Sequence, residues 1–219
     1  MKKLIVLIII LLVIISATIK IPRIRIVCLG DSITRGYMVS KEDNWVSLLG
    51  NKLGDDYKTV NYGLTSRTLL STGDYPYMEE NKAKRFWDKK EDIVIIMLGT
   101  NDTKSINWDY NRFEKEYKEL IDKLLKEKPN EKIYIMIPPK IFEENISIDR
   151  PNNDNLEDGV IPIINKLKDE YKKIKVIDLY TITKDHSELF IDGIHPNENG
   201  HKVIANEIYK EIEREEKHV

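Results

Sequence analysis

IRIVCLGDSIT occupies residues 24–34 and joins an apolar run to a short polar segment. The run is rich in β-branched residues, which is typical of a strand that is buried on both faces. Gly30 ends this strand, and the residues after it lead towards a helix. Ser32 is therefore predicted on a strand-to-helix turn, where its hydroxyl is exposed and backbone N–H groups point outward. Taken alone, Gly-Asp-Ser is better explained as an ordinary turn with a helix cap.

Four more apolar stretches follow along the chain, and helical patterns separate them. Strands are predicted at residues 57–61, 93–98, 132–137 and 175–179, and the main helices at 45–53, 109–128, 161–172 and 200–217. Residues 65–90 show a less regular pattern. Residues 145–158 form a polar insert that is rich in Asn and Asp.

This alternation of strands and helices predicts an α/β fold, a three-layer α/β/α sandwich around a five-stranded parallel sheet. Right-handed crossovers leave few topologies, and a flavodoxin-like strand order 2-1-3-4-5 is expected. Neither a repeat nor an interdomain linker is visible, so residues 21–219 are predicted to form one domain, a size that buries a full core.

Composition narrows the classes of function. The net charge is −2, so nothing favours nucleic acid or a strongly acidic partner. Cys28 is the single cysteine of the sequence, which rules out an internal disulfide, and it is interpreted as a small core residue. The sequence has no cysteine pair and no HExxH motif, so no metal site is expected.

Residues 1–20 differ in kind from the rest. Lys2 and Lys3 precede an unbroken apolar run from Leu4 to Ile15. A basic start and a short apolar core predict a signal peptide, and an uncleaved N-terminal membrane anchor remains the alternative because the whole segment reaches the lower limit of a membrane span. In either case the domain is expected outside the cytoplasm, secreted or attached to the membrane. The oligomeric state is left open.

Chemically useful residues follow four of the predicted strands. Ser32 follows the first strand, Gly63 the second, Asn101 the third, and the segment DGIHPN (192–197) the fifth. His195 is the candidate base for Ser32, and Asp192 is placed to fix the imidazole tautomer. The N–H of Ser32, the N–H of Gly63 and the amide of Asn101 are candidate donors for an oxyanion.

Each of these residues also has an ordinary structural explanation. Asp192-Gly193 alone is most often a turn, Asn101-Asp102 a helix cap, and Gly63 a residue with positive φ. Asp31 and Asp102 are interpreted as capping or supporting groups. These separate explanations do not predict that the sites coincide at one sheet edge, so the catalytic interpretation is favoured.

Gly30-Asp31-Ser32, Asn61-Tyr62-Gly63, Gly99-Thr100-Asn101-Asp102 and Asp192-Gly193-Ile194-His195-Pro196 together resemble the four motif blocks of the SGNH/GDSL hydrolases. The resemblance covers nearly the whole chain from Ile24 onward. It implies that Ser32 is the nucleophile, His195 the base and Asp192 its orienting partner. It also implies an oxyanion hole made by Ser32, Gly63 and Asn101, and ester hydrolysis without a metal or organic cofactor.

The segments 61–70, 73–77 and 103–108 are similar to sialate O-acetylesterase-like and related carbohydrate acetylesterase members of that family. Thr65-Ser66 departs from the Ser-Gly that is expected after the glycine of the second block. Four side chains in these loops are candidate substrate-binding residues, with ordinary loop packing as an equal alternative: Arg67, Tyr75, Tyr77 and Trp108.

The leading hypothesis is a serine esterase that removes O-acetyl groups from a carbohydrate or glycan, with a small-molecule or polysaccharide ester as its partner. A second hypothesis keeps the fold and changes the substrate to that of a lysophospholipase, lipase or thioesterase at a membrane. A third is a non-catalytic exported module that binds glycans, which the presence of Ser32, Asp192 and His195 disfavours.

Overall fold

The computed structural model describes residues 24–142 and 147–217. The signal peptide or anchor predicted at residues 1–20 lies outside them. Within the described parts of the chain, none of the helices has both the length and the apolarity needed to cross a membrane.

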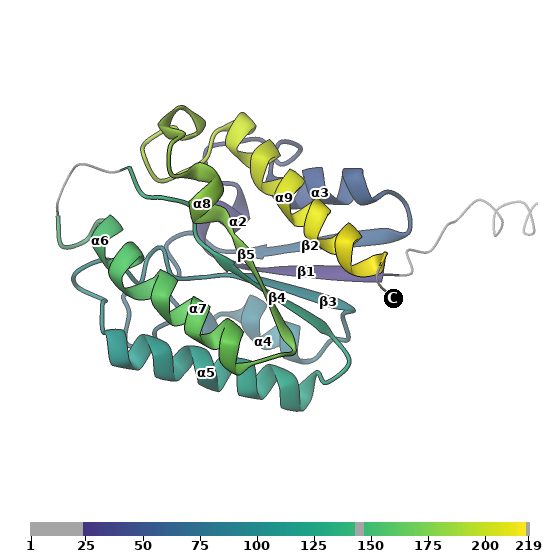
Figure 1. Cartoon of the computed structure of the whole chain (residues 1–219), viewed down its shortest axis with the longest axis horizontal. Coiled ribbons are helices and arrows are strands. Elements are labelled where there is room, and N and C mark those ends of the chain that lie inside the picture. Colours follow the sequence, from purple (N-terminus) through teal and green to yellow (C-terminus); the bar gives the residue numbers. More distant parts are fainter. Residues whose placement is uncertain (1–23, 143–146, 218–219) are drawn as a thin grey trace, which may run out of the picture.

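The five predicted strands form one parallel sheet in the order β2-β1-β3-β4-β5, so the predicted topology is confirmed (Figure 1). Their bounds are Ile24–Gly30 for β1, Tyr57–Gly63 for β2, Ile93–Met97 for β3, Lys132–Ile137 for β4 and Ile174–Asp178 for β5. Gly30 pairs with Gly63 on one side and with Met97 on the other. The carboxyl ends of β1, β2 and β3 therefore lie side by side.

Helices cover both faces of the sheet, which gives the expected three layers (Figure 1). One face packs against α3 (Trp45–Leu53) and α9 (Glu198–Glu216), and the other against α4 (Asn81–Trp87), α5 (Tyr110–Glu127) and α7 (Ile161–Glu170). Side chains of β1 alternate between the two cores: Ile26 and Cys28 face α3 and α9, whereas Val27 and Leu29 face the other layer. Burial raises the pKa of the Cys28 thiol, as expected for a core cysteine.

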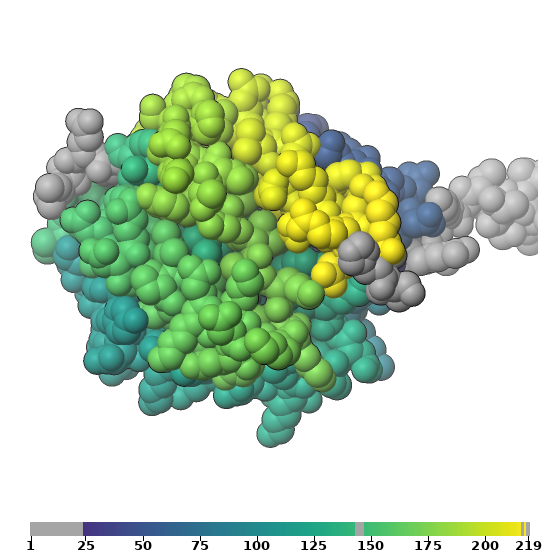
Figure 2. All heavy atoms as spheres, viewed as in Figure 1, coloured from purple at the N-terminus to yellow at the C-terminus, as the bar shows by residue number. Residues whose placement is uncertain are grey.

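In the space-filling view, the last third of the chain, coloured green to yellow, covers most of the visible face (Figure 2). Much of this surface belongs to α7, α9 and the short helix α8 (Leu179–Thr183). Helices pack on both faces of the sheet, and the residues of β3 and most of those of β1 and β4 are buried.

A short helix, α2 (Ser32–Arg35), begins directly after β1. Asp31 caps it, because its Oδ1 accepts the N–H of Ile33 at 2.9 Å, and this agrees with the capping role predicted for Asp31. Gly36 ends the helix in the left-handed region, with φ of 80°. Ser32 is thus held as the first helical residue at the carboxyl edge of the sheet.

Several short elements lie where the sequence pattern was irregular. Residues 65–90 contain η1 (Tyr77–Glu79), which is one turn of 3₁₀-helix, and the helix α4. The polar insert ends in α6 (Asn153–Asn155) and in the π-helical turn η2 (Leu156–Val160). Leu156 and Val160 are buried against the core. The insert therefore joins directly to α7 and forms part of the packed domain.

Candidate active site

Ser32, His195 and Asp192 form one chain of hydrogen bonds. His195 Nε2 lies 2.9 Å from Ser32 Oγ, and His195 Nδ1 lies 2.7 Å from Asp192 Oδ2. The three side chains come from the first turn of α2 and from the loop between α8 and α9. The imidazole thus contacts the hydroxyl with one nitrogen and the carboxylate with the other, which is the geometry of a serine nucleophile with its base and orienting group.

Asp192 is fixed by its own loop as well as by His195. Its Oδ1 accepts the backbone N–H groups of Ile194 at 3.1 Å and His195 at 2.8 Å, and Gly193 turns the chain with φ of 79°. Burial alone would raise the pKa of Asp192, but the hydrogen bonds from the His195 backbone and ring outweigh it and the pKa is lowered. The carboxylate is therefore charged when it faces the imidazole.

Close packing of α2 on β2 fixes the height of Ser32 above the sheet. A Cβ on Gly63 would lie 2.2 Å from Arg35 N, so the glycine is needed for close approach and not for a positive φ. Asn61 adds a clamp, since its Nδ2 donates to the Thr34 carbonyl at 2.7 Å. Asn44 Nδ2 donates to the same carbonyl at 3.0 Å. No role of their own was predicted for Asn61 and Asn44.

Of the three predicted oxyanion donors, Ser32 follows β1, and Gly63 and Asn101 lie at the carboxyl ends of β2 and β3. Gly63 and Asn101 both hold partners inside the protein. The Gly63 N–H donates to Asn61 Oδ1 at 2.9 Å. Asn101 Nδ2 donates to the Arg67 carbonyl at 3.2 Å and to Asp31 Oδ2 at 3.4 Å. The two bonds of Asn101 are long, so this amide exchanges partners more readily than the Gly63 N–H. Their oxyanion role stays a prediction.

Two buried carboxyl groups, those of Asp31 and Asp102, lie beside the residues of the site. Burial raises the pKa of Asp31 to about 6, although the Ile33 N–H and the nearby His195 lower it. Burial likewise raises the pKa of Asp102 to about 7. Asp102 accepts the backbone N–H groups of Leu69 at 3.0 Å and Leu70 at 2.8 Å, which fixes the loop after β2 against the loop after β3. These positions agree with a supporting role.

Arg67 and Tyr75 contact each other beside this edge. The Tyr75 ring centroid lies 5.3 Å from the Arg67 guanidinium carbon, and Tyr75 is 52% exposed. The guanidinium is held by Glu80, whose Oε1 accepts its Nε–H at 3.0 Å, and by the Thr65 carbonyl. Arg67 is thus committed to internal partners, while the Tyr75 ring remains open to a ligand.

The prediction that Tyr77 binds substrate is wrong. Tyr77 is fully buried, and its hydroxyl donates to the Tyr62 carbonyl at 2.8 Å, so it supports β2 from within the core. Trp108 is half-buried and packs against Phe113, with ring centroids 5.4 Å apart. A Cβ on Gly159 would lie 2.1 Å from the Trp108 ring. Loop packing therefore accounts for Trp108.

Tyr37 lies next to the imidazole and was not predicted. Its ring centroid is 4.9 Å from that of His195, with the planes inclined at 62°, and the side chain is 44% exposed. The contact joins loops that are 158 positions apart, so local sequence carries no sign of it. A tyrosine directly after the glycine that ends α2 was the only available clue.

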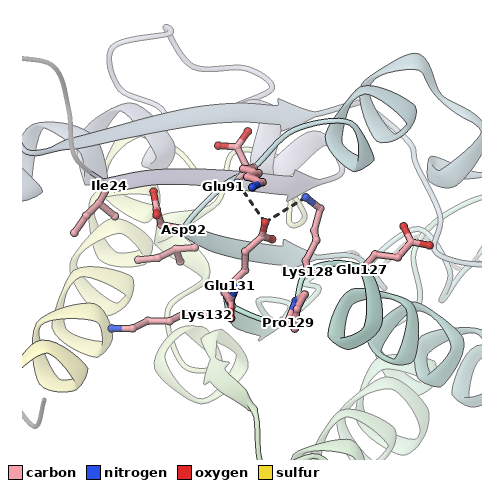
Figure 3. A pocket seen from close by; sticks show the side chains of 11 residues that line it. Ile24, Glu91, Asp92, Glu127, Lys128, Pro129, Glu131 and Lys132 are labelled. Carbon is pink, nitrogen blue, oxygen red and sulfur yellow. Dashed lines mark hydrogen bonds and ion pairs between the residues drawn. The ribbon is translucent and has the colours of Figure 1, made fainter.

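A hollow of about 480 Å³ lies at the amino ends of β1, β3 and β4, at the sheet edge opposite Ser32 (Figure 3). Glu131 Oε1 lies at its centre and accepts the Glu91 N–H and the Lys128 ammonium, each at 3.2 Å. These bonds join the end of α5 to the strand starts. The hollow is therefore a structural junction that is separate from the triad.

Among residues 24–142 and 147–217, no group of three or more His, Cys, Asp or Glu side chains is arranged to hold a metal ion.

Comparison with known proteins agrees with this geometry. The model of the GDSL-like Lipase/Acylhydrolase family matches residues 28–203. An acetylxylan esterase from Xylanibacter ruminicola is 32% identical over 85% of this chain and 42% of its own length. An isoamyl acetate-hydrolyzing esterase from Schizosaccharomyces pombe is 28% identical over 56% of this chain and 50% of its own length.

Solved structures share the fold. A carbohydrate acetylesterase from Sinorhizobium meliloti superimposes with a TM-score of 0.70 at 20% identity, covering 87% of this chain and 99% of that one. The chain spans half or less of the length of the two curated relatives, whereas it matches nearly the full length of this structure.

Proposed function

The chain belongs to the GDSL-like lipase/acylhydrolase family, and we propose that it is a serine esterase that hydrolyses carboxylic esters through an acyl-enzyme. The observation that carries the proposal is the hydrogen-bonded chain from Ser32 through His195 to Asp192. A serine hydroxyl is a weak nucleophile, and an adjacent base that removes its proton is what makes it reactive.

In the first step, Ser32 Oγ attacks the ester carbonyl carbon while His195 Nε2 takes the hydroxyl proton. Negative charge develops on the carbonyl oxygen, and the N–H of Ser32, the N–H of Gly63 and the Asn101 amide are the proposed donors to it. The bond between the carbonyl carbon and the alcohol oxygen then breaks. His195 returns its proton to that oxygen, and the alcohol leaves.

In the second step, water replaces the alcohol. His195 accepts a proton from this water, whose oxygen attacks the acyl carbon bound to Ser32. The bond to Ser32 Oγ breaks, the proton passes to Ser32, and the free acid leaves. Asp192 stays charged throughout and stabilises the imidazolium that forms in each step.

A carbohydrate acetyl ester is the substrate that we favour. The relative from Xylanibacter ruminicola is an acetylxylan esterase, and the similar structure from Sinorhizobium meliloti is a carbohydrate acetylesterase. The exposed ring of Tyr75, held over Arg67 beside the site, adds an aromatic surface of the kind that packs on a sugar ring.

A longer-chain ester is the second candidate, because exposed apolar side chains gather at the catalytic edge. Among the described residues, the exposed large hydrophobic side chains all lie in the segments that follow the carboxyl end of a strand. They are Tyr37, Met38, Tyr75, Ile106, Tyr110, Ile148 and Ile191. A comparison of acetyl with octanoyl esters separates the two candidates.

We also propose that the domain works outside the cytoplasm, on the basis of the apolar sequence in residues 1–20. β1 begins at Ile24 and ends beside Ser32, so the chain enters the domain at the edge opposite the catalytic one. A retained anchor would hold the site away from its own membrane, which favours a glycan over a lipid of that membrane. N-terminal sequencing of the mature protein decides between cleavage and retention.

Replacement of Ser32 by alanine tests the activity itself. The variant should lose hydrolysis of 4-nitrophenyl acetate and labelling by a fluorophosphonate, while its melting temperature stays near that of the unchanged protein. Undiminished activity in the variant would end the serine-esterase hypothesis. An absence of Ser32-dependent turnover of any ester would instead favour the non-catalytic glycan-binding module.

A further inference from the structure

Tyr37 reaches the catalytic histidine because of the way in which α2 ends. Gly36 takes φ of 80°, and the Tyr37 N–H donates to the Ser32 carbonyl at 3.0 Å. A Cβ on Gly36 would lie 2.2 Å from Asn44 Nδ2, so only glycine allows this turn to pack so closely. The Tyr37 ring then lies edge-on to the imidazole, 4.9 Å between centroids.

The chemistry decides which part of an ester lies beside that ring. His195 must give its proton to the leaving oxygen, so the alcohol part must come within hydrogen-bond reach of Nε2. Gly63 and Asn101, two of the proposed donors to the carbonyl oxygen, lie at the ends of β2 and β3, the strands that flank β1, whereas Tyr37 reaches His195 from the end of α2. A side chain in contact with the imidazole therefore borders the alcohol part.

A hollow of about 270 Å³ begins at Met38, the residue after Tyr37. It is lined by Met38, Val39, Ile191, Asn197, Glu198 and Asn199. The Ile191 N–H donates to the His195 carbonyl at 2.9 Å, so Met38 and Ile191 connect the hollow to the loops that carry Tyr37 and His195. The volume is near the lower end of the roughly 300–1,000 Å³ of small-molecule sites.

The side chains around this hollow differ in character. Met38 and Ile191 are apolar and are 50% and 45% exposed, whereas Glu198 and Asn199 carry exposed polar side chains. Met38 has φ of 71°, a conformation that costs a non-glycine residue energy and that is found repeatedly at ligand-binding sites. Apolar and hydrogen-bonding side chains around one hollow suit the C–H face and the hydroxyls of a sugar.

We propose that Tyr37 and this hollow form the subsite for the leaving alcohol, and that this alcohol is a sugar unit. This inference rests on the proposed esterase function. The sugar ring packs on Tyr37 and Met38, and its hydroxyls bond to Glu198 and Asn199.

Tyr37→Ala and Tyr37→Phe, assayed with acetylated xylo-oligosaccharide and with 4-nitrophenyl acetate, test the subsite. The alanine variant should lose at least ten-fold in kcat/KM for the oligosaccharide, mainly through a higher KM, and less than three-fold for the aryl ester. The phenylalanine variant keeps the ring and should stay within three-fold on both substrates. Melting temperatures check that each variant folds.

Hydrolysis of the acetyl-enzyme separates binding from positioning of the histidine. Both substrates give the same acetyl-enzyme, and its hydrolysis needs His195 but no longer involves the alcohol. A displaced imidazole would therefore lower the rate constant of deacylation, measured by rapid quench, whereas loss of the alcohol subsite would leave it unchanged. Equal losses, or no loss on the oligosaccharide, would overturn the subsite. Isoamyl acetate is a third substrate, and a larger loss on it than on the oligosaccharide would overturn the assignment to a sugar.

Tyr209→Ala is the matched control, because Tyr209 is a half-buried tyrosine of α9 whose ring contacts Lys52 and belongs to no proposed site. It should change neither substrate's kcat/KM by more than two-fold. The two proposals are tested separately. Ser32→Ala tests whether the protein turns over esters by way of Ser32, and Tyr37→Ala tests which alcohol it accepts.

Discussion

Ser32 Oγ and His195 Nε2 lie 2.9 Å apart, although 163 residues separate them in the sequence. The parallel sheet accounts for this distance, because strands β1 and β5 both end at the same edge and the segment between β5 and α9 brings His195 back to the end of β1. The site therefore depends on the sheet for placement and on short local turns for orientation.

Asp192→Asn should lower kcat for 4-nitrophenyl acetate by roughly 10³–10⁴-fold, since an amide no longer holds the imidazole in the required tautomer or stabilises its charge. The asparagine keeps an oxygen for the backbone N–H groups of Ile194 and His195, so the loop should keep its shape. Steady-state kinetics and the melting temperature check the two expectations.

His186 and Glu188 provide a control for this variant. They form another histidine–carboxylate pair at 2.9 Å, but one that is exposed. Glu188→Gln should leave kcat unchanged. A loss in Asp192→Asn no larger than that in Glu188→Gln would remove Asp192 from the mechanism.

Asn101→Ala should lower kcat by about 10²–10³-fold with little change in KM, because its amide is proposed to bond the oxyanion, whose charge develops only in the transition state. Asn206→Ala, on the exposed side of α9, is the control and should keep full activity. An effect of Asn101→Ala on KM alone would show that the amide binds the ground state and would contradict the oxyanion role.

The strands were predictable because each is a short apolar run that is almost wholly buried, as in β3, where all five residues from Ile93 to Met97 lack exposure. Helix α4 was not, since its seven residues bury only Ala83 and Phe86 and its first turn has no side-chain cap. The short helices α6 and η2 were not predicted for a related reason. Asn and Asp usually indicate loops, yet here they lie on either side of the buried Leu156.

The residues of the site also fall into those that could be predicted from the sequence and those that could not. Ser32, Asp192 and His195 lie in short motifs with a known chemical purpose, so they were found from sequence. Tyr37 acts through a contact between two distant loops, and Tyr77 lies in a Gly-Asp-Tyr-Pro-Tyr segment whose composition is that of an exposed turn. Neither burial nor long-range contact is visible in such a segment, which explains both errors.

Tyr77→Phe tests the correction for that residue. It removes the bond that the Tyr77 hydroxyl donates to the Tyr62 carbonyl from within the core, so the free energy of unfolding should fall by about 1–2 kcal/mol. The KM for acetylated oligosaccharide should not change. Urea unfolding and steady-state kinetics measure these quantities, and a raised KM with unchanged stability would restore the substrate-binding role.

His201 should make the domain sensitive to acid. It is fully buried at the start of α9, where its Nδ1 accepts the Trp45 N–H at 3.3 Å. Burial lowers its pKa to about 4, and the nearby charge of His195 acts in the same direction, against the opposite effect of Asp43. In the unfolded chain its pKa is about 6.5.

The difference in proton binding between the folded and the unfolded chain decides whether the free energy of unfolding rises or falls with pH. Between pH 6.5 and about 4, the unfolded chain holds a proton on His201 that the folded protein does not, so the free energy of unfolding falls as the pH falls. This contribution is present in full above pH 6.5. At pH 5 it should have fallen by about 2 kcal/mol.

His201→Asn isolates this effect, because asparagine can still accept the Trp45 N–H but does not titrate. The variant should be less stable at pH 7.5, since it leaves a cavity in the core. However, its free energy of unfolding should decrease by about 2 kcal/mol less than that of the unchanged protein between pH 7.5 and pH 5. Urea unfolding at the two pH values measures both differences, and equal decreases in the two proteins would assign the acid sensitivity to other groups.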